Sequence, residues 1–111
     1  MNRLNEIEAR ANAATEGPWE GIRYPDGLLG RVIGGNGFGV AEDFPADADA
    51  EFIAHARADV PDMAAALRAV LELHKREESP SGDYCDECFP NEWHWPCSTV
   101  ATIRQRIGDD L

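Results

Sequence analysis

The chain has 111 residues, of which 43% are hydrophobic, so its length and composition predict one folded domain and exclude wholesale disorder. Ten Lys and Arg residues stand against 21 Asp and Glu, and the formal net charge of -11 disfavours binding to a phosphate backbone. No run approaches the ~18 apolar residues of a membrane span, and residues 1–8 lack the basic-then-apolar order of a signal peptide. We therefore expect a protein of the reducing cytoplasm that makes no contact with a membrane.

The N-terminal segment, residues 1–15, has the pattern of an amphipathic helix. Its apolar residues recur at spacings of three and four, on one helical face: Leu4, Ile7, Ala11 and Ala14. Gly17 and Pro18 end the helix, because glycine suits the left-handed exit and proline cannot continue the helical hydrogen bonds. We predict a short helix that needs packing partners for its stability.

Residues 19–42 have the pattern of a small antiparallel β-meander. Six of the ten glycines in the chain lie between residues 27 and 39, among three short extended runs, 19–24, 28–33 and 38–41. Adjacent strand residues face opposite sides of a sheet, so only one of the neighbours Val32 and Ile33 can lie on the buried face, and the pattern does not say which. We expect that face to include Trp19, Ile22, Val40 and either Val32 or Ile33.

Two turn signals separate these runs. Pro25-Asp26-Gly27 predicts the first turn, because proline presets one dihedral angle and glycine supplies a positive φ. Asn36-Gly37 predicts a two-residue type I′ hairpin, which needs a positive φ at both positions. This hairpin also explains the glycines of residues 34–39, which lack the following helix and the Gly-Lys ending of a phosphate loop.

Residues 46–76 are predicted to form a helical pair. The first helix, 46–57, begins with acidic residues, which suit the positive end of the helix dipole, and its apolar stripe includes Phe52 and Ile53. Asp59 has the position of an N-cap and Pro61 is tolerated in a first turn, so a second helix starts near residue 60 and ends near residue 75. The apolar stripe of this second helix consists of Met63, Leu67, Val70, Leu71 and His74.

A polar break at residues 77–82 precedes a cysteine-rich tail, residues 84–107, which ends in a last helix. Val100, Ile103 and Ile107 form the apolar face of this helix, and Ser98 or Thr99 can cap it. Together these elements predict one α+β domain over residues 1–111. Three to four helices would pack with the small antiparallel β-meander, and the C-terminal segment would resemble a zinc knuckle.

The chemistry of the chain concentrates in its three cysteines. Cys85 and Cys88 form a Cys-x-x-Cys step, which is typical of structural zinc because two thiolates at this spacing can turn around one tetrahedral ion. Cys97 opens the last helix, where backbone N–H dipoles favour a thiolate. Three thiolates leave one position of a tetrahedron for another ligand. We therefore predict a structural Zn2+ in a zinc knuckle-like segment.

Two histidines are candidates for the fourth position. His94 gives the compact spacing Cys-x2-Cys-x5-His-x2-Cys and lies between Trp93 and Trp95. His74 lies at the end of an apolar helical stripe, from which it would join the tail to the body of the domain. This link to the body of the domain favours His74 and keeps His94 as the alternative fourth ligand.

Other chemistries of the cysteines are less favoured. Free buried thiols are common in proteins, a disulfide is disfavoured in the cytoplasm, and a redox pair lacks its βαβ context. A closed shell of three cysteines and one histidine leaves no position for a catalytic water. No Ser/His/Asp or paired-carboxylate arrangement stands out, so we expect the protein not to be an enzyme.

Residues 13–20 (Ala-Ala-Thr-Glu-Gly-Pro-Trp-Glu) and 48–61 resemble the Ead-like early proteins of temperate bacteriophages. The tail, with Leu73-His74, Cys85-x-x-Cys88 and Trp95-Pro96-Cys97-Ser98-Thr99-Val100, is similar to small uncharacterised proteins of actinobacterial phages. Their final motif usually reads Pro-Cys-Pro-Thr, and this chain has Ser98 in place of the second proline. The resemblance implies a phage origin and favours His74 as the fourth ligand, but it implies no biochemical activity.

Together these features predict a small acidic phage-type accessory protein of the bacterial host cytoplasm. It would bind a host or phage protein with a basic surface, as an inhibitor or a DNA-mimic-like modulator. The alternative is a nucleic-acid-binding zinc module, which would need a local basic face despite the overall charge. The candidates for that face are Lys75, Arg76, Arg104 and Arg106.

Overall fold

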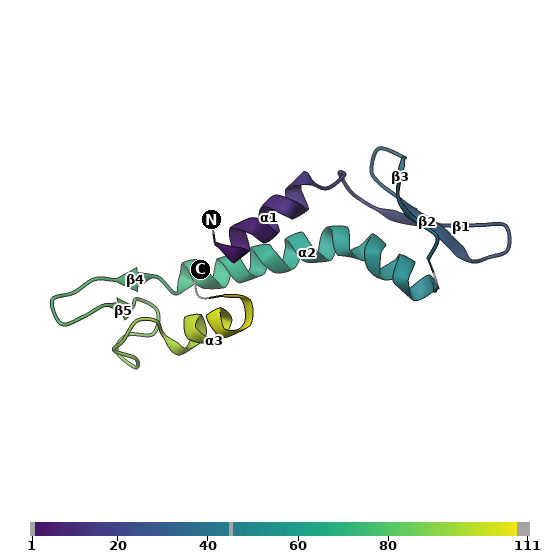
Figure 1. Cartoon of the computed structure of the whole chain (residues 1–111). Helices are drawn as coiled ribbons and strands as arrows, with labels where there is room; N and C mark the ends of the chain where they lie inside the picture. The colour runs from purple at the N-terminus through teal and green to yellow at the C-terminus, as the bar shows by residue number, and fades with distance from the viewer. Residues whose placement is uncertain (1, 45, 109–111) are drawn as a thin grey trace. The chain divides into compact units, whose positions relative to one another are not determined.

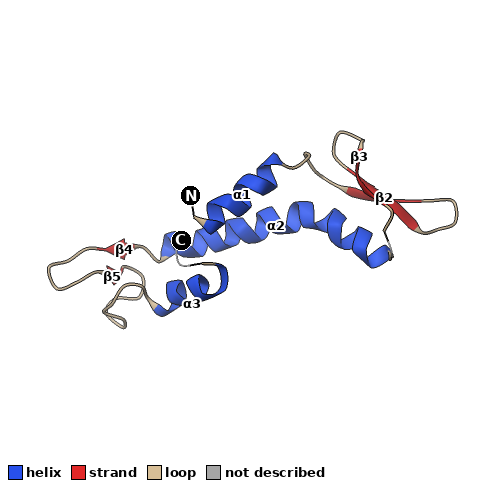
Figure 2. Ribbon diagram, viewed as in Figure 1, coloured by secondary structure: helices blue, strands red, loops and turns tan. Residues whose placement is uncertain are grey.

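The computed structural model describes residues 2–44 and 46–108, so Met1, Pro45 and residues 109–111 of the predicted domain lie outside the described residues. Helices and a small antiparallel sheet occur together, which confirms the predicted α+β class (Figure 2). In chain order, the elements of the described residues (Figure 1) are α1 (Arg3–Ala13), β1 (Glu20–Arg23), β2 (Leu29–Ile33), β3 (Gly39–Glu42), α2 (Asp47–Leu73), β4 (Arg76–Glu77), β5 (Tyr84–Cys85) and α3 (Ser98–Ile107).

The chain forms two compact units. One, which we call the sheet unit, is Glu8–Met63, and the other, which we call the cysteine unit, combines Met1–Ile7 with Ala64–Leu111. The single-domain organisation over residues 1–111 stays a prediction. Among the residues that the structure describes, we find no helix with the length and apolar character needed to cross a membrane.

The sheet unit is built on three antiparallel strands in the order β1-β2-β3. Val32 lies on the central strand, opposite Gly21 of β1 and Ala41 of β3, and its side chain is fully buried. The structure thus selects Val32 over Ile33, which is half-buried, for the core position. Val32 and Ala50 are the centre of a small core, against which five half-buried side chains pack: Trp19, Val40, Phe44, Ile53 and Ala54.

The predicted type I′ hairpin at Asn36-Gly37 is wrong. Gly37 has a positive φ of 82°, but Asn36 is not among the described residues with a positive φ. The Gly37 N–H donates to the Gly34 carbonyl at 3.0 Å, and the Gly34 N–H donates to the Phe38 carbonyl at 2.9 Å. The connection is therefore a three-residue loop, a β-turn followed by a left-handed glycine, because only one residue with positive φ is then required.

The first turn of the sheet repeats this geometry. The Gly27 N–H donates to the Tyr24 carbonyl, the Tyr24 N–H donates to the Leu28 carbonyl, and Gly27 has a φ of 87°. The side chains of Asp26 and Asn36 occupy equivalent positions, and each accepts a hydrogen bond from the backbone N–H two residues on. Both hairpins thus use an Asx oxygen followed by a left-handed glycine.

The predicted helical pair over residues 46–76 is a single helix, α2, and Pro61 lies inside it. An interior proline removes one backbone hydrogen bond and costs roughly 3 kcal/mol, which ends a weak helix. Here nine of the 27 residues of α2 are alanine, the strongest helix former, so the helix continues through the proline. Asp59 is therefore an interior helical residue and no N-cap.

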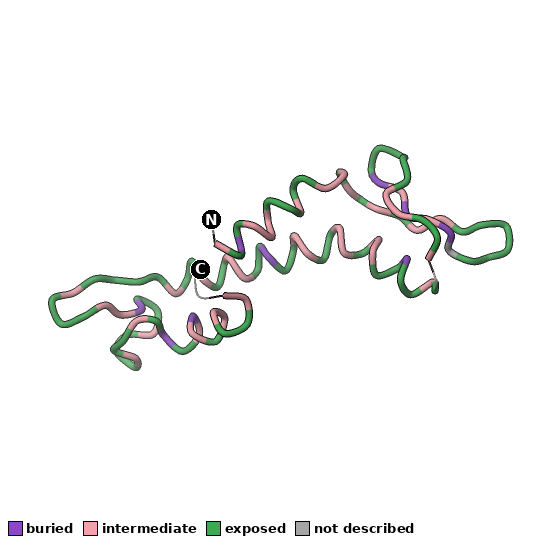
Figure 3. Tube along the Cα trace, viewed as in Figure 1, coloured by how far each residue is buried: buried purple, intermediate pink, exposed green. Residues whose placement is uncertain are grey.

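The buried stripe of α2 also differs from the prediction. Ala50 and Ala64 are buried, whereas Phe52 and Met63 are 75% and 63% exposed. Most other residues of this helix are half-buried or exposed, as Figure 3 shows. The helix phase thus directs small residues inward, because alanine allows the close approach of neighbouring backbone.

The cysteine unit combines the first residues of α1, the end of α2, the short β4–β5 pair and α3. The predicted last helix is confirmed as Ser98–Ile107, but its predicted cap is wrong, since the N-cap residue is Cys97 and its side chain makes no capping hydrogen bond. The buried hydrophobic residues of this unit, among those described, are Leu4, Ala64, Cys85, Cys97 and Val100. Two of the three cysteines are therefore part of its core.

Candidate metal centre

His74 is the residue directly after α2. Its backbone N–H donates to the Val70 carbonyl at 3.1 Å, which extends the last helical turn and orients the side chain. The imidazole is half-buried, and Leu71, one turn earlier, packs against the buried cysteines. The helical spacing thus directs Leu71 and His74 toward the cysteines, although Met63 and Val70 of the predicted stripe are exposed.

The β4–β5 pair places the Cys-x-x-Cys step beside the end of α2. Cys85 is the register partner of Arg76, and the Asp86 N–H donates to the Lys75 carbonyl at 2.9 Å. The chain then turns tightly, since the Phe89 N–H donates to the Cys85 carbonyl at 3.0 Å. This turn brings the Cys85 and Cys88 side chains to the same side, as a shared ligand requires.

Cys97 is placed by the start of α3. Its carbonyl accepts the first helical hydrogen bond, from the Ala101 N–H at 2.9 Å. Glu92 supplies the cap that Cys97 lacks, because its carboxylate accepts hydrogen bonds from the Ser98 backbone N–H at 2.8 Å and from the Ser98 hydroxyl. These hydrogen bonds lower the pKa of Glu92, because they stabilise its charged form.

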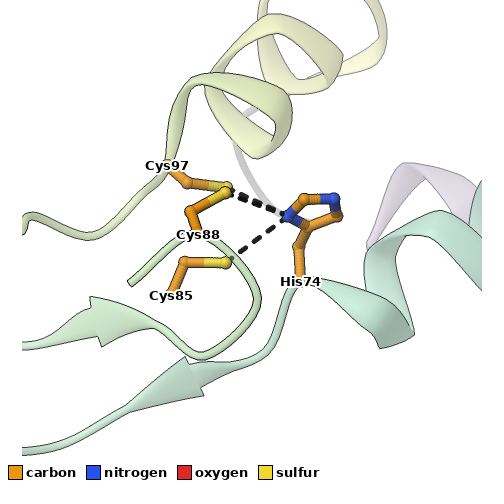
Figure 4. A group of neighbouring side chains, drawn as sticks. All are labelled: His74, Cys85, Cys88 and Cys97. Atoms are coloured by element: carbon orange, nitrogen blue, oxygen red, sulfur yellow. Dashed lines mark hydrogen bonds between the residues drawn. The ribbon is translucent and has the colours of Figure 1, made fainter. Parts of the chain in front are cut away.

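The three thiols surround one nitrogen of His74 (Figure 4). Nδ1 lies 3.4 Å from Sγ of Cys85, 3.5 Å from Sγ of Cys88 and 3.6 Å from Sγ of Cys97. An imidazole nitrogen either donates one proton or accepts at one lone pair, so three simultaneous hydrogen bonds exceed its capacity. All four ligand atoms lie within 4.8 Å of one another, which makes this a plausible metal site.

The observed spacing also matches a tetrahedral site in size. Zinc binds sulfur at about 2.3 Å and nitrogen at about 2.0 Å, which places nitrogen and sulfur ligands about 3.5 Å apart in a tetrahedron. The three distances from Nδ1 of His74 fall around this value. The histidine presents Nδ1 to the cysteines, and Nε2 points away from them (Figure 4).

Crowding of the three sulfur atoms changes their acidity. Desolvation, together with hydrogen bonding and charge repulsion from Cys85 and Cys97, raises the pKa of Cys88 to about 12. The Cys88 thiol therefore stays protonated at neutral pH unless a positive charge compensates its thiolate. A divalent cation supplies that charge, and its binding would release protons from the thiols.

The structure brings together the four side chains that the sequence predicts, His74, Cys85, Cys88 and Cys97. The alternative fourth ligand, His94, is exposed and lies outside this group. The carboxylate of Glu92, for which the sequence predicts no capping role, helps to place Cys97 by holding the start of α3. No signal in the sequence marks this role, because the contact spans six residues of an irregular loop.

Comparison with protein-family models, with curated proteins and with solved structures gave no match. The resemblance to Ead-like phage proteins therefore stays a prediction. Its two segments do meet in the sheet unit, where the Thr15 carbonyl accepts hydrogen bonds from the indole of Trp19 at 2.8 Å and from Nε of Arg57 at 3.0 Å. The case for a metal rests on the geometry of the four ligands.

Proposed function

We propose that this protein is a small acidic binding module that is stabilised by one structural zinc ion and acts by binding another protein. His74, Cys85, Cys88 and Cys97 would hold the ion. The observation that carries the proposal is the convergence of three thiols on a single imidazole nitrogen at 3.4 to 3.6 Å. The resemblance to phage early proteins supports an accessory role in a phage-infected bacterium.

Zinc is the ion that suits these ligands best. Thiolate and imidazole ligands select zinc or iron–sulfur clusters, and a Cys3His tetrahedron is a common structural zinc shell. The zinc shell would be closed by four protein ligands, which leaves no position for a reacting water. We therefore propose a structural and not a catalytic ion, in keeping with the expectation of a protein that is not an enzyme.

The composition of the cysteine unit explains why an ion is needed. Units of this size bury little apolar surface and often gain stability from a metal or from disulfides. Cys85, Cys97 and Val100 form its buried cluster, with Leu71, Cys88 and Trp95 packed against it. A zinc ion at this point would join α2, the β4–β5 pair and α3 through one centre.

The charge of the chain indicates the class of partner. A net charge of -11 favours association with a basic protein surface and speeds the encounter at low ionic strength. Residues 77–103 contain six carboxylates and no lysine or arginine, so the segment around the candidate metal centre carries only negative formal charge. An inhibitor or DNA-mimic-like modulator of a basic protein fits this distribution.

A nucleic-acid-binding module is supported less well. Arg76 forms an ion pair with Asp83 across the β4–β5 loop, and the Arg104 guanidinium lies over the Trp95 ring at 5.9 Å. Both cations are thus engaged within the protein. Phosphate binding would require them to exchange these contacts against the repulsion of the surrounding carboxylates.

Native mass spectrometry of the freshly purified chain, with and without a chelator, tests the zinc proposal. We expect one zinc ion per chain, removed slowly by EDTA. His74→Ala should lower zinc affinity by at least tenfold, whereas the matched variant His94→Ala should leave it unchanged. A protein that is purified without metal and has a melting temperature insensitive to EDTA would contradict the proposal.

A salt series tests the partner class. Proteins captured from bacterial lysate by the zinc-loaded chain should have a basic isoelectric point, and 0.5 M NaCl should release them, because screening weakens attraction between exposed charges. Capture that is independent of salt would rule out the charge-driven mode of binding.

A further inference from the structure

Three aromatic rings form a row on the cysteine unit. The Tyr84 and Phe89 ring centroids are 4.8 Å apart and tilted by 45°, and those of Phe89 and Trp93 are 4.8 Å apart in an edge-on arrangement. We call these three side chains the aromatic row. Tyr84 is half-buried, whereas Phe89 is 41% and Trp93 is 63% exposed. Exposed neighbouring rings of this size are typical of interaction sites.

The candidate metal centre holds the aromatic row in place. Tyr84 precedes Cys85, Phe89 follows Cys88, and the Phe89 N–H donates to the Cys85 carbonyl. Trp93 follows Glu92, whose N–H donates to the Cys88 carbonyl at 3.2 Å. The row is therefore presented on a loop that is pinned at both ends, so binding would cost little ordering entropy.

The surroundings of the aromatic row are acidic. Asp86 and Glu87 lie between the two cysteines of the Cys-x-x-Cys step, and both are exposed. Three thiolates, one neutral imidazole and one Zn2+ would add a further formal charge of about -1 to this loop. Phosphate groups are repelled by such a surface, and a cationic ligand with a flat face is attracted to it.

The chain itself contains the contact that such a ligand would make. The guanidinium of Arg104 lies 5.9 Å from the centroid of Trp95, two residues from Trp93. Arginine stacks on aromatic rings and pairs with carboxylates through the same planar group, which lysine cannot do. The face of Trp93 and the carboxylates of Asp86 and Glu87 offer these two kinds of contact to an arginine from outside.

We propose that the aromatic row is the docking site for an arginine-bearing segment of the partner protein. An arginine of this segment stacks on Trp93, which Phe89 supports edge-on, and neighbouring cationic groups of the segment pair with Asp86 and Glu87. The inference rests on the proposed function, because it names the surface and the chemistry by which the module recognises a basic protein. It specifies arginine over lysine and protein over nucleic acid.

Calorimetric titration of the zinc-loaded full chain with two capped octapeptides, (Arg-Gly)4 and (Lys-Gly)4, tests the proposal. The arginine peptide should bind about two- to fivefold more tightly than the lysine peptide, because only a guanidinium stacks flat on a ring while it pairs with a carboxylate. Trp93→Ala should abolish this preference. The matched control is Phe52→Ala, which removes an even more exposed ring from the sheet unit and should change nothing.

A second variant covers the possibility that loss of Trp93 disturbs the loop. The double variant D86N/E87Q keeps the aromatic row and should weaken binding of both peptides while the arginine preference remains. Zinc content and the circular dichroism spectrum are measured for every variant. Equal affinity for the two peptides, full binding by Trp93→Ala, or tighter binding of a single-stranded oligonucleotide would each overturn the inference.

The outcomes separate this inference from the proposed function. A chain that is isolated with one zinc ion but shows no arginine preference contradicts the docking site and leaves the structural zinc intact. A chain isolated without zinc contradicts the proposed function, whatever the peptides do.

Discussion

The sheet unit and the cysteine unit are of almost equal length but reach their structure by different means. In the sheet unit, backbone hydrogen bonds of two hairpins organise strands of four or five residues around Val32. In the cysteine unit, β4 and β5 have two residues each, and the buried cluster is Cys85, Cys97 and Val100. Where the strands are short, His74 and the three cysteines connect the elements in place of a hydrogen-bonded sheet.

The two units also differ in how far apart in the sequence the residues lie that fix their structure. The turns at residues 24–28 and 34–38 are set by neighbouring residues, an Asx side chain and a glycine. The candidate metal centre joins His74 to Cys97, which are 23 residues apart. A turn that is set by neighbouring residues is unaffected by a substitution elsewhere in the chain. A site that is shared by four side chains is lost when any one of them is replaced. Three predictions test this contrast, from the largest expected effect to the smallest.

Cys97→Ala should have the largest effect, because loss of a ligand of the proposed zinc ion would remove folding energy of at least several kcal/mol. We expect loss of bound zinc and of hydrogen-exchange protection in α3, whereas the amides of β2 keep theirs. Exchange measured by NMR or mass spectrometry at pH 7 provides the check. Wild-type protein in EDTA serves as the control and should reproduce the variant. Equal loss of protection in β2 would contradict the separation of the two units.

Gly35→Ala should have an intermediate effect, which is confined to the sheet unit. A Cβ at this position would lie 2.5 Å from the Gly17 carbonyl oxygen and 2.7 Å from that of Glu16, and backbone atoms cannot move away cheaply. Overpacking of this kind costs about 1–3 kcal/mol. Thermal unfolding should show the loss, with zinc content unchanged. The matched variant Gly39→Ala meets only the Glu42 side chain at 3.3 Å and should be tolerated.

Glu92→Gln should have the smallest effect, because Glu92 caps α3 from an irregular loop. The hydrogen bonds from Ser98 hold the pKa of Glu92 below its ordinary value of 4.5. A lowered pKa in the folded state stabilises the protein above the unfolded value, and this stability is lost as the pH falls through the folded pKa.

The melting temperature of Glu92→Gln should therefore lie slightly below that of the wild type at pH 7, and the difference should shrink towards pH 4. Both proteins are compared at each pH, so that any release of zinc affects them alike. Glu78→Gln, an exposed acid in the same unit, serves as the control and should match the wild type throughout. A difference that stays constant with pH would contradict the capping role of the ionised carboxylate.

Local sequence patterns predicted several features well. The periodicity of Leu4 and its neighbours placed α1, and the apolar runs between glycines placed the three strands within a residue or two. The Cys-x-x-Cys step and the helical phase of His74 predicted a cluster that the structure contains. These features depend on residues that are close in the sequence, or on the regular spacing of side chains along a helix.

Other features required the tertiary structure. Pro61 has the local signature of a helix start, but α2 runs through it, because helix formation depends on all flanking residues and their packing. The β4–β5 pair was not predicted, since two-residue strands have no periodicity of their own. The aromatic row was also missed, because Tyr84, Phe89 and Trp93 share no regular element.

The sequence by itself determined the α+β class, the acidic surface and the ligand types of the candidate metal centre, because composition and spacing are properties of the chain alone. Only the tertiary structure decided that Val32 and not Ile33 is buried, and that His74 and not His94 faces the cysteines. The physical reason is the same in both cases. In each pair the local pattern leaves both residues possible, and packing against distant segments makes one of them the inner residue.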